Sequence, residues 1–236
     1  VANVSYHDID PLSAAPLDVS YLLHVHGLTH YPDQSGPLYT SLATYWIKRA
    51  EFPHARSVFE GAYQTVVTLR DFSVVFDAGV EFEESVISSL MDSLAEEADE
   101  DEDEAEVEEE RKGTESELDE RMKYFEELMD RRPFLVNEVL LRRNPNDVQE
   151  WEKRVVLYGA DVEKVRTILL ICHRSTVNLA YRTLQVVETY TKALSVIAPR
   201  KATVGLHSLW IHFAKYYETA GELDSARKVF ERATQV

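Results

Sequence analysis

Hydrophobic side chains near residues 38–62 recur with the period of an α-helix. The first stripe falls at i, i+4, i+7 and i+8 and consists of Leu38, Leu42, Tyr45 and Trp46. A second stripe follows at Ala55, Val58, Phe59 and Ala62. Between them RAEFP predicts a turn and the start of the second helix. Pro53 is acceptable there, because the N–H groups in the first turn of a helix have no partner within the helix and the missing N–H of proline costs nothing. The pattern predicts two helices joined by a short turn.

Nearly the same twenty residues return towards the other end of the sequence. ATYWIKRAEFPHARSVFEGA (residues 43–62) and AKYYETAGELDSARKVFERA (residues 214–233) are identical at nine of twenty positions and share the frame A-R-x-V-F-E-x-A. The turn of the second block contains Gly221, and glycine is the residue that most readily adopts a left-handed helix end. The sequence therefore predicts two copies of one helical pair.

Twenty residues are expected to define these repeats structurally. In the first copy they are Tyr39, Ala43, Tyr45, Trp46, Ala55, Arg56, Phe59, Glu60 and Ala62. In the second copy they are Trp210, Ala214, Tyr216, Tyr217, Ala226, Arg227, Phe230, Glu231 and Ala233, with Trp151 and Tyr190 between the copies. The alanines offer small surfaces for aromatic rings of neighbouring helices. We therefore expect rings such as Phe230 to be buried in the stack.

The sequence between the copies also has helical periodicity. Helices are predicted within residues 70–91, within residues 117–133, where Pro133 should end the helix, and on both sides of the break at residues 144–146. No stretch alternates with the period of a strand. Because one helix pair is too small to bury its apolar face alone, the pairs must stack. The prediction is an all-α superhelical solenoid of antiparallel helix pairs over residues 1–236. Because the sequence begins with Val1 and not with Met, we also expect it to be a fragment of a longer protein.

The charge of the chain is concentrated in one segment. The formal net charge is −17, and twelve of the fifteen residues in EEADEDEDEAEVEEE (residues 96–110) are Asp or Glu. Removing these twelve from 42 acidic residues leaves 30 against 25 basic ones, a net charge of −5. Because like charges at this density repel, residues 95–116 are predicted to be a disordered acidic insertion. The body lacks the basic stripe that strong nucleic-acid binding needs.

Few residues offer candidate chemistry. Arg56 and Glu60, like Arg227 and Glu231, stand at i, i+4 in the order opposite to that of a stabilising surface pair, so their charges should face neighbouring helices. The only histidine cluster, HVHGLTH, is interrupted by Gly27 and lacks the H-E-x-x-H pattern of metalloproteases. No phosphate-binding glycine loop or apolar run long enough for a membrane helix is present. The sequence thus predicts no enzyme activity, metal site, cofactor, small-molecule substrate or membrane contact.

The aromatic residues of the first helix, followed by A-R-x-V-F-E-x-A in the second, form a pattern that resembles the half-a-TPR (HAT) repeat of RNA-processing assemblies. Longer segments, including TLRDFSVVFDAGVEFEES and RRPFLVNEVLLRRNPNDVQEW, resemble the middle of SYF-type pre-mRNA-splicing factors, the XPA-binding protein group of animals. The resemblance covers roughly residues 31–236 and includes an acidic insertion after the EFEES helix.

This resemblance implies a non-enzymatic scaffold subunit of the nuclear, spliceosome-associated NineTeen complex. Its implied partners are other splicing-complex proteins, including another HAT-repeat protein. The alternative is a HAT-repeat adaptor of another RNA-processing assembly, in rRNA maturation or 3′-end processing, with weak direct RNA contact.

VRTILLICHRSTVNLAYRTLQ (residues 165–185) interrupts the resemblance, and we interpret it as a retained intron. Trp151 and Tyr190 are 39 residues apart, whereas both clear repeats space their aromatic residues by twenty; removal of the 21 residues leaves 18. The segment contains no Asp or Glu, holds the only cysteine, Cys172, and can be encoded with a GT donor and a CAG acceptor. A lineage-specific loop or extra helix is the alternative.

Overall fold

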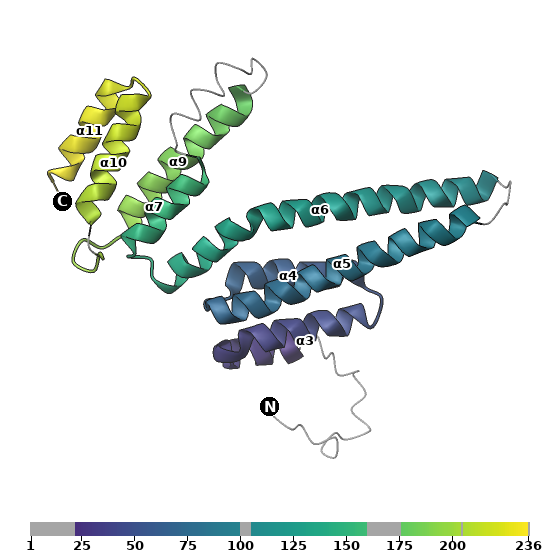
Figure 1. Cartoon of the computed structure of the whole chain (residues 1–236). Coiled ribbons are helices and arrows are strands. Elements are labelled where there is room, and N and C mark those ends of the chain that lie inside the picture. Colours follow the sequence, from purple (N-terminus) through teal and green to yellow (C-terminus); the bar gives the residue numbers. More distant parts are fainter. Residues whose placement is uncertain (1–21, 100–104, 160–175, 204, 236) are drawn as a thin grey trace.

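The computed structural model describes residues 22–99, 105–159, 176–203 and 205–235. Short helical turns, η1 (Leu22–Gly27), α2 (Leu28–His30) and η2 (Pro32–Gln34), precede the longer helices. These are α3 (Ser35–Ile47), α4 (Phe52–Thr65), α5 (Leu69–Asp99), α6 (Ala105–Arg143), α7 (Val148–Leu157), α9 (Thr176–Val196), α10 (Leu206–Thr219) and α11 (Leu223–Ala233). The described ranges contain no β-strand. The predicted all-α solenoid of helix pairs is confirmed (Figure 1).

The two sequence copies fold as the pairs α3–α4 and α10–α11, and their turns have nearly the same backbone. Glu51, before α4, has φ −89° and ψ 65°, and Glu222, before α11, has φ −92° and ψ 69°. Ala50 and Gly221, one residue earlier, both have positive φ, 59° and 84°. A left-handed conformation costs nothing for glycine but strains an alanine. The first copy therefore makes the same turn with a less suitable residue.

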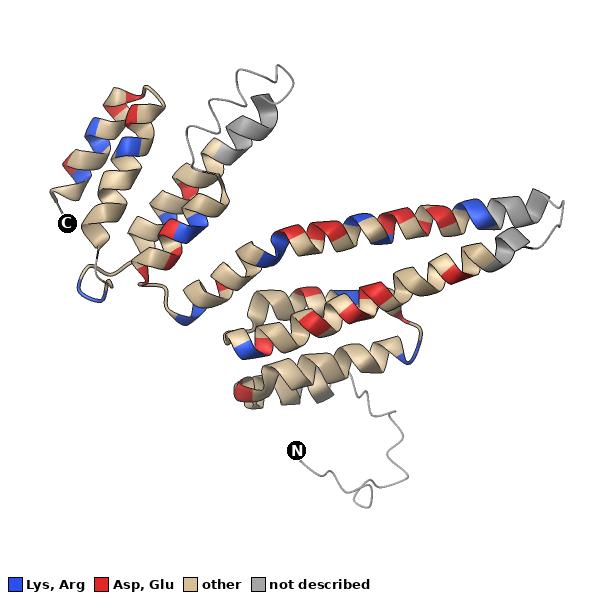
Figure 2. Ribbon diagram, viewed as in Figure 1, with Lys and Arg blue, Asp and Glu red and all other residues tan. Residues whose placement is uncertain are grey.

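Helices α5 and α6 form a long antiparallel hairpin whose tip projects away from the other helices (Figure 1). The predicted disordered loop at residues 95–116 is wrong over most of its length, because α5 continues to Asp99 and α6 begins at Ala105. Glutamate is a good helix former, and Arg111 pairs with Glu115 one turn later at 3.5 Å. Figure 2 shows Asp and Glu positions in red along the described parts of both helices.

Pro133 does not end its helix as predicted, because α6 continues through it to Arg143. A proline inside a helix removes one backbone hydrogen bond and crowds the preceding turn. Burial on both sides offsets that cost, since Leu128 before the proline and Leu135 and Val139 after it are all at most 7% exposed. Tertiary packing thus decides the length of this helix.

The buried side chains form two clusters. The first lies among α3, α4, α5 and α6 and includes Phe59, Phe72 and Phe76. The second lies among the end of α6, α7, α9, α10 and α11 and includes Trp151 and Phe213. Helix α6 contributes to both clusters and so links the two halves of the solenoid. No helix of the described residues is both long and apolar enough to cross a membrane.

Part of the suspected retained intron lies outside the described residues, at 165–175. Residues 176–185 form the first turns of α9. Leu184 is 60% exposed, whereas Val186, directly after the segment, is 2% exposed and belongs to the second cluster. Val186, Tyr190 and Ala193 of α9 belong to the second cluster, as does Ile197 directly after the helix. The intron interpretation stays a prediction.

Candidate interaction surfaces and the repeat network

The expected small and aromatic positions of the first copy meet in the first cluster. Ala43, Ala55 and Ala62 are fully buried, and Phe59 is 3% exposed. The Tyr39 hydroxyl accepts a hydrogen bond from Thr65 Oγ1 at 2.8 Å, which joins α3 to the end of α4. The alanines thus mark the close approach of α3 and α4.

The aromatic residues at the end of α3 lie at the edge of this cluster rather than inside it. Trp46 is half-buried and stacks on His54 of α4, with ring centroids 4.8 Å apart. Tyr45 packs edge-on against Trp46, and the Arg49 guanidinium lies 4.4 Å from the centre of the Tyr45 ring. Both rings therefore stabilise the turn between α3 and α4.

Arg56 faces the neighbouring helix α5 instead of pairing within α4. Its Nε and Nη2 atoms donate to the two carboxylate oxygens of Glu83, each at 2.9 Å. Arg121 of α6 donates to the same carboxylate at 3.3 Å, and Glu83 is only 2% exposed. Burial alone would lower the pKa of Arg56, but its bonds to Glu83 outweigh this and raise it. A buried carboxylate shared by two arginines connects three helices.

Glu60 makes a second connection, to α6. It accepts a hydrogen bond from the Tyr124 hydroxyl at 2.7 Å and from both terminal nitrogens of Arg131, at 3.1 and 2.9 Å. Partial burial would raise the pKa of Glu60, but the bonds from Arg131 and Tyr124 outweigh it and lower the pKa below its ordinary value of 4.5. Arg56 lies 4.1 Å from the centre of the Tyr124 ring, so the two connections share one network.

The second cluster holds the corresponding residues of the later copy. Ala214 is fully buried, Trp210 is 9% exposed, and Tyr190 of α9 stacks on Phe213 with ring centroids 4.8 Å apart. Burial raises the pKa of Tyr190 to about 12. The Trp151 indole donates to the carbonyl of Pro145 at 2.9 Å. Half-buried Tyr216 and Tyr217, and Ala233 of α11, pack at the edge of this cluster.

Helix α11 departs from the expected burial. Ala226 is 7% exposed, but Phe230 is 50% and Leu223 is 65% exposed, so the predicted burial of Phe230 is wrong for this chain. Together with Arg227, Glu231 and Glu218, these residues line a shallow hollow of about 570 Å³. Within the described residues, the side chains of Arg227 and Glu231 make no ion pair. The same motif that is covered in α4 is open in α11.

Sequence reasoning missed the partners in the network, which are Glu83, Arg121, Tyr124 and Arg131, and it also missed the separate contacts of Arg142. Glu83 carries a recognisable signal, because it is a charged residue on the apolar face that Gly79, Phe82 and Val86 define. That face is very close-packed at Gly79, where a Cβ atom would collide with the Tyr63 hydroxyl. A charge on such a face indicates a buried ion pair.

Arg142, near the end of α6, binds the end of α4. Its Nη1 donates to the Val66 carbonyl at 2.5 Å and its Nη2 to the Tyr63 carbonyl at 2.7 Å. Burial lowers the pKa of Arg142. These carbonyls belong to a helix end that lacks intrahelical partners, so one arginine of a later helix caps α4.

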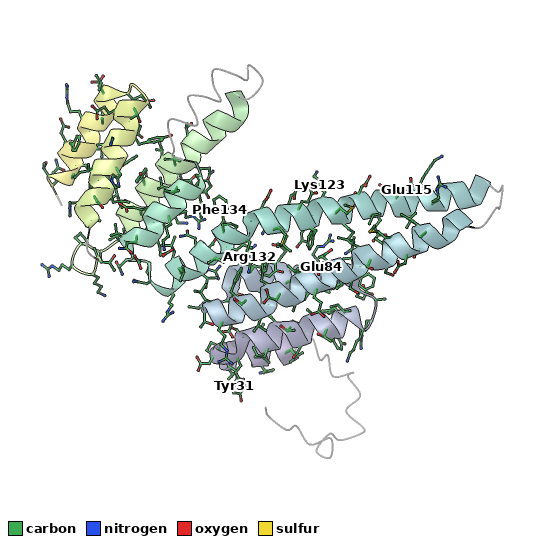
Figure 3. The ribbon with its side chains drawn as sticks, in the orientation of Figure 1. Tyr31, Glu84, Glu115, Lys123, Arg132 and Phe134 are labelled. Carbon is green, nitrogen blue, oxygen red and sulfur yellow. The ribbon has the colours of Figure 1, made fainter. Side chains whose placement is uncertain are left out.

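The exposed surface of α6 is mixed in character. Figure 3 shows Glu115 and Lys123 along the projecting part of α6 and Glu84 on α5, whereas Arg132 and Phe134 lie nearer the junction with α7. The Arg132 guanidinium lies 5.2 Å from the centre of the Phe76 ring, and Phe134 packs on Tyr158, directly after α7, with ring centroids 5.0 Å apart. Met122 and Met129 are 44% and 40% exposed on the same helix.

A larger hollow of about 750 Å³ lies between α6 and α7, and its charged side chains already have partners. Glu150 accepts from Asn137 and Lys153, and Glu152 accepts from Ser208 at 2.9 Å and lies 3.0 Å from His212. Among the described residues, no three His, Cys, Asp or Glu side chains are grouped to hold a metal. The polar groups here hold helices together.

Comparison with known proteins gives this architecture a family. The sequence model described as "Pre-mRNA-splicing factor SYF1 middle HAT repeat" matches residues 5–170. The chain belongs to the SYF1 family of pre-mRNA-splicing factors. The model described as "Pre-mRNA-splicing factor Syf1/CRNKL1 C-terminal HAT repeat" matches residues 199–236, which contain α10 and α11. Both resemblances stated from the sequence, to HAT repeats and to SYF-type factors, are thereby confirmed.

Curated relatives of the SYF1 family align along most of the chain. The pre-mRNA-splicing factor SYF1 of Mycosarcoma maydis is 44% identical over 100% of this chain and 22% of its own length. That of Aspergillus fumigatus is 46% identical over 93% of this chain and 23% of its own length. The Homo sapiens protein is 41% identical over 89% and 21%, respectively. The chain therefore spans about a fifth of the length of these relatives.

Proposed function

We propose that this chain is part of a scaffold protein of pre-mRNA splicing that binds other splicing factors through stacked HAT repeats. The observation that carries the proposal is the SYF1 family match over residues 5–170, together with identities of 41–46% to pre-mRNA-splicing factors. A solenoid presents an extended surface relative to its mass, which suits a protein with several partners.

The proposal includes a non-enzymatic role. The charged side chains that sequence reasoning singled out in the first copy are used to hold helices together: Arg56 binds Glu83, and Glu60 binds Arg131 and Tyr124. A catalytic acid or base must be within hydrogen-bond reach of a reacting group of a substrate. In the network described here, the partners are other side chains of the same fold.

The assembly we propose is the NineTeen complex, in the nucleus, with another HAT-repeat protein among the partners. The projecting α5–α6 hairpin is the first surface to consider for a protein contact. Met122 and Met129 are exposed there, and methionine is an adaptable contact residue at protein-binding surfaces. Exposed carboxylates beside them, such as Glu126 and Asp130, favour a partner with basic side chains.

The alternative function is that of a HAT-repeat adaptor in rRNA maturation or 3′-end processing, with weak direct RNA contact. Arg49 and Arg143 are exposed, but the net charge of −5 outside the acidic segment opposes strong binding to a phosphate backbone. Weak binding would depend steeply on salt concentration.

Affinity purification of the tagged full-length protein from nuclear extract, followed by mass spectrometry, tests both proposals. Recovery of NineTeen-complex proteins, retained after ribonuclease treatment, is the expected result. Recovery of rRNA-maturation or 3′-end factors in their place would support the alternative. Loss of all partners after ribonuclease treatment would contradict direct protein scaffolding.

A pair of variants tests the proposed contact on the hairpin. Met122→Glu combined with Met129→Glu adds charge to the exposed stripe and should reduce recovery of at least one partner several-fold. Lys123→Glu, at an exposed position on the same helix, is the matched control. Equal recovery with both variants would exclude this stripe as a contact.

A further inference from the structure

Three loops that join successive helix pairs are tied together at one edge of the solenoid, which we call the loop edge. With their flanking residues, the loops are residues 66–71 between α4 and α5, 142–147 between α6 and α7, and 197–203 between α9 and α10. Arg142 ties the second loop to the first through the two carbonyls at the end of α4. Asn146 ties it to the third, because its Oδ1 atom accepts from the Ala198 N–H at 2.9 Å and its carbonyl accepts from the Thr203 N–H at 3.2 Å. The three loops therefore lie side by side.

The loop edge is basic, although the chain as a whole has a formal net charge of −17. It contains five basic and two acidic residues, a net charge of +3. Both carboxylates serve helices that begin here: Asp71 is 7% exposed and accepts from Thr68 Oγ1 at 2.7 Å, and Asp147 accepts from the N–H of Gln149 in α7. Figure 2 shows Lys and Arg positions in blue at the start of α5, at the end of α6 and in the loop between α9 and α10.

Four cations of the loop edge have no partner in the described part of the fold. They are exposed, and within the described ranges their side chains make no hydrogen bond or ion pair: Arg70, Arg143, Arg200 and Lys201. The arginines of the network among α4, α5 and α6 differ, because each of them binds a carboxylate of a neighbouring helix. The four exposed cations are therefore available to a ligand from outside the chain.

Apolar side chains lie among these cations. Val67 and Leu69 are 48% and 38% exposed and directly precede Arg70 in the chain, apart from Thr68 between them. Val196, at the end of α9, is 42% exposed and stands four residues before Arg200. A surface that mixes free cations with exposed apolar side chains is complementary to a ligand that has both carboxylates and apolar groups.

The composition of the loop edge favours a peptide over a nucleic acid. None of its residues is aromatic, whereas proteins that bind single-stranded RNA use aromatic rings on which the bases stack. A phosphate backbone carries a charge at every nucleotide, so a long RNA would also meet the acidic remainder of the chain. A short acidic segment of a protein can be confined to the loop edge and can bring apolar side chains between its carboxylates.

We propose that the loop edge binds an acidic segment of another protein. The carboxylates of this segment pair with the four exposed cations, and its apolar side chains cover the exposed valines and leucine. The hairpin of α5 and α6 favours a partner with basic side chains, so the molecule has two docking surfaces of opposite charge. This assignment rests on the loop edge itself and does not depend on the role in splicing.

Fluorescence anisotropy on the whole chain tests the loop edge. The probe is a short fluorescein-labelled peptide of repeated Glu-Asp-Leu, which should bind at low salt and bind more weakly as the salt concentration rises. Arg143→Glu combined with Arg200→Glu and Lys201→Glu should raise the Kd of the peptide by about tenfold or more, because three attractive pairs become repulsive. Glutamine at the same three positions should raise it by about threefold or more, which preserves the test if the glutamate variant does not fold.

A matched variant changes the net charge by the same amount elsewhere. Lys48→Glu combined with Lys215→Glu and Lys228→Glu reverses three exposed lysines outside the loop edge. It should change the Kd by less than about twofold, because salt screens charges that are distant from the bound peptide. Equal weakening by the two triple glutamate variants would mean that overall charge attracts the peptide, and the proposal would be wrong.

The apolar part of the contact has its own measurement. Val67→Ser combined with Val196→Ser should raise the Kd of the Glu-Asp-Leu peptide by about threefold, because less apolar surface is buried on binding. The same variant should leave the Kd of a Glu-Asp-Ser peptide of equal length unchanged. An unchanged Kd for the Glu-Asp-Leu peptide would contradict the apolar contact.

Other occupants of the loop edge would overturn the proposal. Tighter binding of oligouridine than of the peptide, lost in the triple glutamate variant of the loop edge, would assign this surface to RNA. Self-association in analytical ultracentrifugation, lost in the same variant, would assign it to the acidic hairpin of a second copy. No binding of the Glu-Asp-Leu peptide at low salt would show that the loop edge does not accept an acidic segment.

Discussion

The first and second copies of the repeat have the same motif and different surroundings. In α4 the motif is closed by α5 and α6, and its charges have partners on both helices. In α11 the motif is open, and its phenylalanine is half exposed. The comparison teaches that the motif prepares a helix for contact, whereas the neighbouring helices decide burial and ion pairing.

The largest expected difference between the copies concerns the two phenylalanines. Phe59→Ala should lower the free energy of unfolding by about 3–5 kcal/mol, because it leaves a cavity among buried rings. Phe230→Ala should cost this chain about 1 kcal/mol or less, since half of the side chain is already in water. Urea unfolding followed by circular dichroism measures both. Equal losses would mean that the two copies are equally well packed.

The buried carboxylate should show the next largest effect. Glu83→Ala leaves Arg56 and Arg121 without their shared partner in a site where Glu83 is 2% exposed, so it should cost about 3 kcal/mol. Arg227→Ala, in the open copy, should cost about 0.5 kcal/mol or less. The same urea titration decides this, and a negligible cost for Glu83→Ala would show that the network does not hold the helices together.

The turns offer a smaller and opposite pair of effects. Ala50→Gly should stabilise the chain by about 0.5–1 kcal/mol, because φ is 59° there and glycine adopts it without strain. Gly221→Ala should destabilise it by about 1 kcal/mol, since φ is 84°. Thermal unfolding of both variants should move the midpoint in opposite directions. A shift in the same direction would refute the equivalence of the two turns.

The smallest predicted effect is a change in pH dependence. The pKa of Glu60 is lower in the folded chain than its ordinary value of 4.5, so its contribution to stability is complete above about pH 4.5 and is lost as the pH falls through the folded pKa. Glu60→Gln should therefore make the free energy of unfolding fall less steeply below pH 4.5. Arg131→Met should have the same effect, because it removes the donor whose hydrogen bonds lower the pKa of Glu60 most. Parallel curves for the parent and both variants, from urea titrations between pH 3 and 7, would contradict the assigned cause.

Periodicity was sufficient to predict the helices and their pairing, because a helix that packs on one side must repeat its apolar residues every three to four positions. It could not identify the partner of Arg56, since the spacing along α4 defines a face but not the helix that meets it. It also misjudged Pro133, where the packing of α6 outweighs the effect of the proline, and it did not anticipate that α5 continues to Asp99 and that α6 begins at Ala105. Phe230 was misjudged because the described residues bury only about half of its side chain.

For residues 165–185, sequence reasoning led to two interpretations, a retained intron and a genuine extra helix. The proposed retained intron rests on spacing and composition, and the described part of the segment includes the exposed Leu184 in α9. Neither family match includes residues 171–198. Sequencing of the spliced messenger RNA decides between the two interpretations. A dominant transcript that retains these codons, with no shorter in-frame form, would favour a genuine extra helix.

The contacts of Arg142 have a consequence for folding during synthesis. It caps α4 through the carbonyls of Val66 and Tyr63, which precede it by 76 and 79 residues. During synthesis, which proceeds from the N-terminus, α3 and α4 are complete long before this arginine exists. The first repeat must therefore remain with an uncapped helix end until the far end of α6 has been synthesised. A ribosome that pauses within α6 would hold the nascent chain in that incomplete state.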